Sequence, residues 1–165
     1  MSDCRSERGF VLIVTSIALV ILMAVAGAGI DLGRMYLIKS ELQAFADAAA
    51  LTAALQLDGT DQGIEGARKA PAELAAGPNA MMWDMGTRPI TEIATSFAKG
   101  ETVPDGKTWV TEPKGAGDLR FVRVVVSAQA PVIFLRAFQP LKTDAAMVVA
   151  ASVAVKTPQS ARLVQ

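Results

Sequence analysis

Histidine is absent from this chain of 165 residues, and cysteine occurs once, at Cys4. The lack of histidine removes Ser–His–Asp and Cys–His catalytic arrangements and the common imidazole metal sites. A single cysteine cannot form a disulfide within the chain. We therefore expect a protein that is not an enzyme, that uses no cofactor, and whose folded part is held by its hydrophobic core alone.

Charge of one sign is also lacking, because 16 basic and 16 acidic residues give a formal net charge of zero. No basic run with interleaved aromatic residues occurs, so we expect no nucleic-acid partner. No glycine-rich phosphate loop followed by lysine occurs, and no small-molecule substrate is expected. Asp58, Asp61 and Glu65 could suggest calcium, but their spacing does not match an EF-hand loop, and a solvated turn after a helix explains them better.

Charged residues and proline are both absent from residues 9–30, a run of 22 residues. At about 1.5 Å per residue, a helix of this length reaches about 33 Å, enough to span a hydrocarbon core of about 30 Å. A secretory signal cleaved near residues 26–29 is the alternative, although helix-favouring residues continue past Asp31 without a break. We expect a membrane anchor, represented by Phe10, Leu12, Ile17, Leu22 and Ile30.

The same helix is expected to continue to Asp58 and Gly59 with one apolar face. Steps of four, three and four residues align a packing stripe on that face. Gly29 and Gly33 have the small-residue spacing that lets membrane helices approach closely, so they form a contact patch or a flexible joint, unless they merely populate a membrane helix. The predicted packing residues are Gly29, Gly33, Ile38, Leu42, Phe45 and Ala49.

Two short helices are predicted after the long one, at residues 63–78 and 87–100. Pro71 should end or kink the first of them. In the second, Pro89 suits the first turn and Gly100 should stop the helix. Both helices should lie on the surface of the domain.

The last third of the chain alternates between apolar and polar residues, which predicts strands. One strand covers residues 119–131, with the even-numbered residues from Val122 to Ala130 on its buried face. A second covers residues 147–155, with the odd-numbered residues on its apolar face, and residues 107–112 form a shorter strand. A sheet with one apolar face needs a cover, and the alanine-rich second half of the long helix supplies it. We therefore predict an α+β fold, in which a long N-terminal helix packs on a small antiparallel sheet.

Residues 7–55 combine Arg-Gly, an apolar span, the pattern D-x-G-R-x-Y and the pattern L-Q-x-x-A-D-A-A-A-L-A-A, with Phe45 and Thr52 as small departures. This combination resembles the N-terminal segment of the TadG-like proteins of Flp (tight-adherence, Tad) pilus systems. The resemblance continues more loosely through residues 119–155. The motif positions are Arg8, Gly9, Asp31, Gly33, Arg34, Tyr36, Leu42, Gln43, Ala46, Asp47, Ala48, Ala49, Ala50 and Leu51.

The resemblance implies an envelope protein with a pilin-like fold and anchor, which helps to assemble Flp-type pili or related secretion machinery. Processed pilins are cut after a glycine and carry glutamate at the fifth mature position, but that position, counted from Phe10, is Val14 here. We therefore expect most molecules to keep the Gly9–Phe10 bond. Longer TadG-like proteins carry a von Willebrand A domain with an Asp-x-Ser-x-Ser metal motif, which this sequence lacks, so no metal site is expected.

Asp31 is the first charged residue after the span, and Arg34 follows it by about one helical turn. We predict that this pair fixes the junction between membrane helix and outer domain, or meets a partner helix there. Tyr36 and Asp47 complete the predicted assembly residues. Residues 131–140 form an apolar knot between two prolines, which either closes the core between two strands or serves as a docking patch.

The combined interpretation is a single-pass protein of the cytoplasmic (inner) membrane, with its N-terminus inside and its C-terminal domain extracytoplasmic. It would be a structural or assembly component of a Tad-type pilus or related secretion apparatus, in contact with membrane lipid and other pilus-assembly or pilin-like proteins. The alternatives are a membrane-tethered ligand-binding or stress-sensing domain and a tethered hydrolase. The expected parts are a cytoplasmic segment (1–8), a transmembrane helix (9–30), its extracytoplasmic continuation (31–57) and a small α+β domain (58–165).

Overall fold

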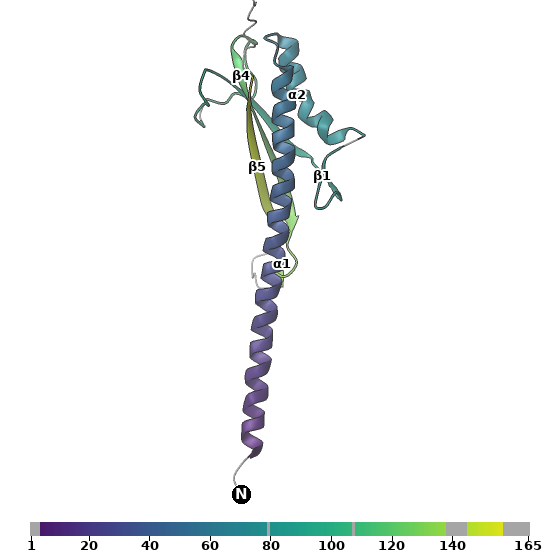
Figure 1. Ribbon diagram of the computed structural model, residues 1–165, viewed down its shortest axis with the longest axis vertical. Helices are drawn as coiled ribbons and strands as arrows, with labels where there is room; N and C mark the ends of the chain where they lie inside the picture. The colour runs from purple at the N-terminus through teal and green to yellow at the C-terminus, as the bar shows by residue number, and fades with distance from the viewer. Residues whose placement is uncertain (1–3, 79, 107, 138–144, 157–165) are drawn as a thin grey trace, which may run out of the picture. The chain divides into compact units, whose positions relative to one another are not determined.

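A long helix dominates the structure, a computed structural model that describes residues 4–78, 80–106, 108–137 and 145–156 (Figure 1). This helix, α1 (Cys4–Gln56), runs without interruption, as the sequence predicts. Its residues belong to two compact units. Among the described residues, the first unit holds α1 up to Tyr36 together with residues 130–137 and 145–146, and the second holds residues 37–129 and 147–156.

A three-stranded sheet forms the framework of the second unit. Its strand order is β3 (Glu92–Lys99), β4 (Leu119–Pro131) and β5 (Ala145–Val155). Strands β3 and β4 pair antiparallel, with Phe97 opposite Val122. The predicted strand at residues 119–131 is confirmed, and its even-numbered apolar residues lie on the buried face as expected.

The part of α1 after Leu37 packs on this sheet and supplies its cover (Figure 1). Alanine at many positions of the helix lets the two layers approach closely. A hydrogen bond also joins them, since Gln43 Nε2 donates to the carbonyl oxygen of Ala151 at 3.1 Å. The predicted α+β arrangement, a long helix on a small antiparallel sheet, is therefore confirmed. Fully buried residues of the two layers include Ile38, Leu42, Phe45, Ala46, Ala49, Ala50, Ala53, Phe97, Val122, Val124 and Val126.

The predicted helix at residues 87–100 is wrong. This stretch contains β2 (Arg88–Pro89), which pairs with β1 (Met82–Trp83) in a hairpin, and most of it is strand β3. Ile93 and Phe97 share a helix face, but with Thr95 they also form a row of every second residue. Pairing with β4 provides hydrogen-bond partners for the backbone groups of these residues. The stretch therefore forms a strand and not a helix.

Two further strand predictions need correction. Strand β5 exists, but Val148 and Ala150 are its buried residues, whereas the odd-numbered residues from Met147 to Val155 are exposed. Both rows of β5 are apolar, so the alternation could not show which row faces the helix. The short strand predicted at residues 107–112 is not found over its described part, residues 108–112, which holds one isolated bridge. In this bridge, Val110 and Phe97 exchange two backbone hydrogen bonds of 2.8 and 2.9 Å.

Helix α2 (Asp61–Ala76) begins at the cap residue Thr60, whose side chain accepts the backbone N–H of Gly63. Pro71 was predicted to end or kink this helix, and it does not end it, because the helix runs through Pro71. Pro71 lies among the buried residues of α2, where the packing of its ring offsets the missing N–H. Asp58 accepts hydrogen bonds from the backbone N–H and hydroxyl of Thr60, at 2.9 and 2.7 Å, and so closes the turn before α2.

Candidate functional site

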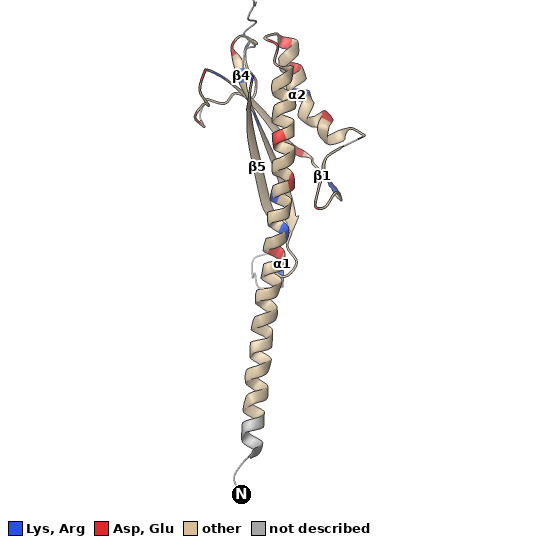
Figure 2. Cartoon of the chain, in the orientation of Figure 1, with Lys and Arg blue, Asp and Glu red and all other residues tan. Residues whose placement is uncertain are grey.

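The first part of α1 presents apolar side chains outward. Among the described residues, α1 is the one helix that is long and apolar enough to cross a membrane. In Figure 2, α1 is tan, the colour of uncharged residues, from the grey N-terminal turns to the first red segment. The sequence has no charged residue between Arg8 and Asp31. The five residues predicted to represent the anchor are all exposed: Phe10, Leu12, Ile17, Leu22 and Ile30.

The six predicted packing residues fall into two groups. Ile38, Leu42, Phe45 and Ala49 are fully buried in the second unit. Gly29 and Gly33 are exposed, and no other described segment lies within 4 Å of a Cβ atom placed on either of them. The predicted packing role of the four larger residues is therefore met by contacts within the described chain. The two glycines face outward.

Asp31 is the most unusual side chain of the first unit, because it is a carboxylate with only 2% of its surface exposed. It accepts three backbone N–H groups from the segment that follows β4. The donors are Ile133 to Oδ1 at 3.2 Å, and Phe134 and Leu135 to Oδ2 at 2.8 and 2.7 Å. This segment leads into the short helix η1 (Leu135–Ala137). We call residues 132–135 the Asp31-bound loop.

The three hydrogen bonds also explain the electrostatics of Asp31. The N–H of Leu135 is the largest influence that holds the pKa of the Asp31 carboxyl below its ordinary value of 3.8. Burial acts in the opposite direction, while the N–H groups of Ile133 and Phe134 and the charge of Arg34 lower the pKa further. The net effect favours the ionised carboxylate, which is the form that can accept all three N–H groups.

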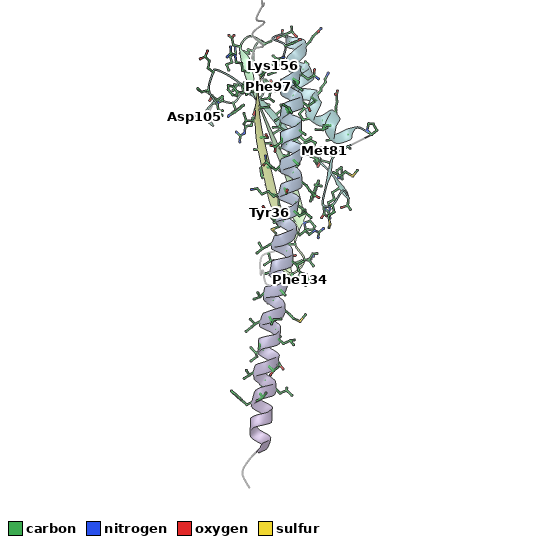
Figure 3. All side chains as sticks on the ribbon, viewed as in Figure 1. Tyr36, Met81, Phe97, Asp105, Phe134 and Lys156 are labelled. Carbon is green, nitrogen blue, oxygen red and sulfur yellow. The ribbon has the colours of Figure 1, made fainter. Side chains whose placement is uncertain are left out.

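Gly27 lets the Asp31-bound loop approach α1 closely. Figure 3 shows Phe134 against this helix, on the N-terminal side of Tyr36. A Cβ atom on Gly27 would lie 2.7 Å from Cγ and Cδ1 of Phe134 and 2.8 Å from its Cβ. Such distances are too short for any side chain, so the observed contact requires glycine. Gly27 and Asp31 lie four residues apart on one face of α1 and together hold the loop.

The other predicted assembly residues differ in their relation to Asp31. Arg34 is half-buried, and its charge acts on Asp31. Tyr36 is exposed. Asp47 is exposed and accepts a hydrogen bond of 2.9 Å from Gln43, one turn earlier on α1. The sequence singled out Asp31 and Arg34 by their place after the span, but it held no signal that Asp31 would bind residues about a hundred positions later.

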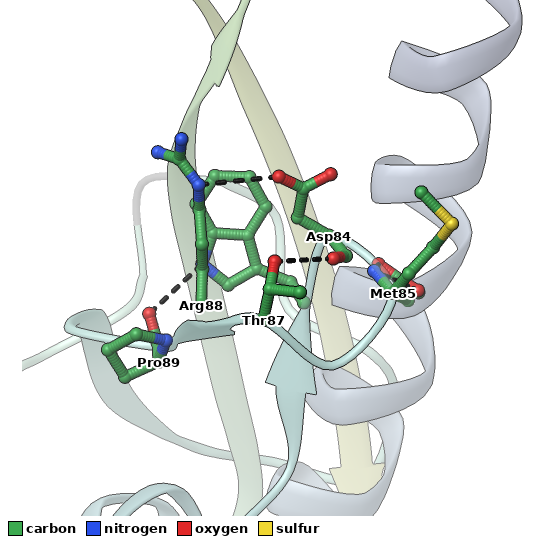
Figure 4. A network of polar contacts seen from close by, with 7 residues as sticks. Asp84, Met85, Thr87, Arg88 and Pro89 are labelled. Atoms are coloured by element: carbon green, nitrogen blue, oxygen red, sulfur yellow. Dashed lines mark hydrogen bonds and ion pairs between the residues drawn. The ribbon is translucent and has the colours of Figure 1, made fainter.

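A second polar cluster, which sequence reasoning missed, lies in the β1–β2 hairpin (Figure 4). Asp84 is buried and forms an ion pair of 3.3 Å with Arg88, whose guanidinium lies over the Trp83 ring. Glu41 of α1 accepts the backbone N–H of Met85 at 3.0 Å and so ties the hairpin to the helix. Asp84 and Met85 both have φ of 57°, a conformation that side chains seldom adopt. The cluster positions a turn and has the character of a structural clamp.

The described residues offer limited chemistry for a ligand. No group of three or more His, Cys, Asp or Glu residues that could hold a metal ion occurs within the described ranges. The second unit has a cavity of about 480 Å³, mostly apolar, with three charged residues on its wall. Its lining residues are Phe97, Ala98, Lys99, Thr108, Val110, Glu112, Pro113, Lys114 and Leu119.

Comparison with known proteins bears on α1. Residues 9–56 match the Tad family model, which is described as "Putative Flp pilus-assembly TadE/G-like". No curated protein and no solved structure matches the chain. The match covers the outward-facing apolar stretch, Asp31 and the packing stripe, so the resemblance read from the motif residues is confirmed over this range. From Gly9 to Gln56 the chain is therefore similar to the Tad segment of Flp pilus-assembly TadE/G-like proteins.

Proposed function

We propose that this chain is a single-pass component of a Tad (Flp) pilus-assembly apparatus in the cytoplasmic membrane. Residues 9–30 anchor it, the N-terminus lies in the cytoplasm, and the α+β domain lies outside. Its role is structural and not enzymatic, and its partners are membrane lipid and other proteins of the apparatus. The observation that carries this proposal is the coincidence of the Tad segment with a helix that changes from outward-facing and apolar to buried against a sheet.

The exposure of the apolar stretch supports the proposal that membrane lipid surrounds it. Large side chains such as Leu12, Leu22 and Val25 each expose more than three fifths of their surface. A patch of this extent on a protein in water would promote aggregation, whereas a bilayer solvates it. A helix also satisfies its own backbone groups, which any segment inside hydrocarbon must do.

The proposal is tested by deleting the gene in a strain that makes Flp pili and measuring pilin on the cell surface. We expect deletion to reduce surface pilin and the wild-type gene to restore it. Asp31→Asn and Arg34→Gln should restore it poorly although the protein reaches the membrane at its normal level. Lys39→Gln, which removes a charge at an exposed position on the same helix, is the matched control and should restore pilin fully. Normal piliation of the deletion strain would refute the assembly role.

A second candidate, a membrane-tethered ligand-binding domain, has one observation in its favour. The cavity of about 480 Å³ beside β3 has the size and apolar character of small-molecule sites. Neighbouring genes discriminate between the two candidates. An adjacent secretion ATPase and prepilin peptidase favour the pilus role, whereas a gene with no such neighbours favours the ligand-binding role.

A further inference from the structure

The Asp31-bound loop is held at the end of the uncharged stretch of α1. Its two attachment points, Gly27 and Asp31, belong to the last uncharged turn and to the first charge after it. Under the proposed function, this is the depth at which hydrocarbon gives way to the outer headgroups. A segment attached there meets the membrane surface.

The outward side of this loop is apolar. Ile133 exposes 54% of its surface and Phe134 exposes 41%. Apolar side chains of α1 from the adjoining turns, Ile30 and Leu32, are exposed as well. The loop and the helix thus form one apolar band that continues the surface of the proposed anchor.

Backbone N–H groups of the loop have hydrogen-bond acceptors within the protein, as a segment in an environment with little water requires. Irregular backbone in contact with lipid requires internal partners for its N–H groups. Asp31 accepts the N–H groups of Ile133, Phe134 and Leu135, three consecutive residues of the loop. In turn, these three donors provide the partners that a carboxylate near hydrocarbon needs.

We propose that residues 132–135 dip into the outer membrane–water boundary beside α1, with Ile133 and Phe134 among the lipids and Asp31 holding the backbone. The loop then serves as a second membrane contact besides the helix. The inference depends on the proposed function, since it assumes that residues 9–30 cross the bilayer. Lipid is the favoured occupant because the exposed side chains are continuous with the lipid-facing surface of the anchor.

The test uses the full chain in proteoliposomes, with an environment-sensitive fluorophore on a single cysteine. In a Cys4→Ser background, Ile133→Cys places the label on the loop. Leu22→Cys places it within the span, and Leu51→Cys on the exposed surface of α1, about 30 Å farther along the helix than Asp31. Leu51 is 59% exposed, close to the exposure of Ile133, which makes it a matched control. Quenching by spin-labelled lipids is compared with quenching by iodide in the buffer.

We expect the label at Ile133 to emit at shorter wavelength than the label at Leu51. Lipids spin-labelled near the headgroup should quench it, and iodide should quench it weakly. Adding Asp31→Ala should release the loop, shift the Ile133 emission to longer wavelength and raise iodide quenching, with no change at Leu22. Asp31→Asn, which keeps an acceptor oxygen, should give a smaller shift.

The control positions separate the two possible failures. If lipid quenches the label at Leu22 but not the label at Ile133, the anchor stands and the loop inference is refuted. If lipid quenches neither label, the membrane anchor itself is refuted. A third result would also overturn the inference: the label at Ile133 is shielded from iodide, but lipid does not quench it. If this shielding rises with the protein-to-lipid ratio, the loop lies in a contact between copies of the chain.

Discussion

Asp31 and Gly27 show how single residues determine the attachment of a distant segment. The carboxylate supplies three hydrogen bonds, and the glycine supplies the space in which Phe134 lies. Gly29 and Gly33 match a known spacing for helix contact, but within the described chain Gly27 is the helix glycine that Phe134 contacts. Sequence alone could not rank these three glycines, because the ranking depends on where residue 134 lies.

Alanine substitutions at two neighbouring glycines should have opposite effects. Alanine normally stabilises a helix interior by about 1 kcal/mol relative to glycine. Gly29→Ala should follow this rule, because its Cβ would meet open space. Gly27→Ala should displace the loop, because its Cβ would overlap Phe134. Hydrogen exchange at the Phe134 and Leu135 amides measures the effect. It should be faster in Gly27→Ala only, and equal rates in both variants would contradict the prediction.

The attachment of the loop should depend on pH. The pKa of the Asp31 carboxyl is lowered in the folded protein. The stabilisation that the ionised carboxylate gives to the loop is therefore fully present above the ordinary carboxyl pKa of 3.8. It is lost as the pH falls through the lowered folded value, because a protonated carboxyl accepts fewer N–H groups. Amide exchange at Ile133, Phe134 and Leu135, corrected for intrinsic rates, should lose protection below about pH 4. In Asp31→Asn this pH dependence should disappear, and its persistence would assign the effect to another carboxyl group.

At the scale of elements, α1 meets two environments along one continuous helix. Before Asp31 its large apolar residues point outward, and after Leu37 a stripe of them is buried against the sheet. Helical periodicity made this buried stripe predictable from the sequence, because apolar residues that recur every 3.6 residues on average indicate an α-helix with one apolar face.

Two leucines of α1 provide a direct measure of this packing. Leu42 is fully buried, so Leu42→Ala should lower the free energy of unfolding of the second unit by about 3 kcal/mol. Leu51 is 59% exposed, and Leu51→Ala should change the free energy of unfolding by less than about 0.5 kcal/mol. Urea unfolding of the full chain in detergent micelles, followed by tryptophan fluorescence, tests both. A small cost at Leu42 would show that the helix is loosely packed on the sheet.

Strands β3 and β5 show where element prediction fails. The sequence of β3 fits a helical face and a strand row equally well, and its hydrogen bonds to β4 decide the outcome. In β5 both rows are apolar, so only the packed structure shows that Val148 and Ala150 face inward. In both cases the deciding partner is distant in sequence, and local pattern carries no information about it.

At the scale of the whole molecule, the chain should remain in membranes after washing with high salt or carbonate. Leu19→Arg together with Leu22→Arg places two charges in the uncharged run, each costing about 3 kcal/mol at the centre of a membrane helix. This double variant should be released by carbonate. The matched control, Leu51→Arg with Leu55→Arg, changes exposed residues of the same helix outside the run and should stay in the pellet. Release of the wild-type chain would exclude the anchor.

Local sequence pattern was sufficient to predict the long helix, its change from an uncharged run to an amphipathic face, and the alternating strand that it covers. These features follow from local periodicity and from the Tad motif, both of which lie within short stretches of chain. Three features became visible only in the folded chain: the buried face of β5, the strand at residues 92–99, and the binding of residues 133–135 by Asp31. Each of these outcomes requires a hydrogen-bonding or packing partner from a remote part of the chain, and such partners exist only once the chain has folded.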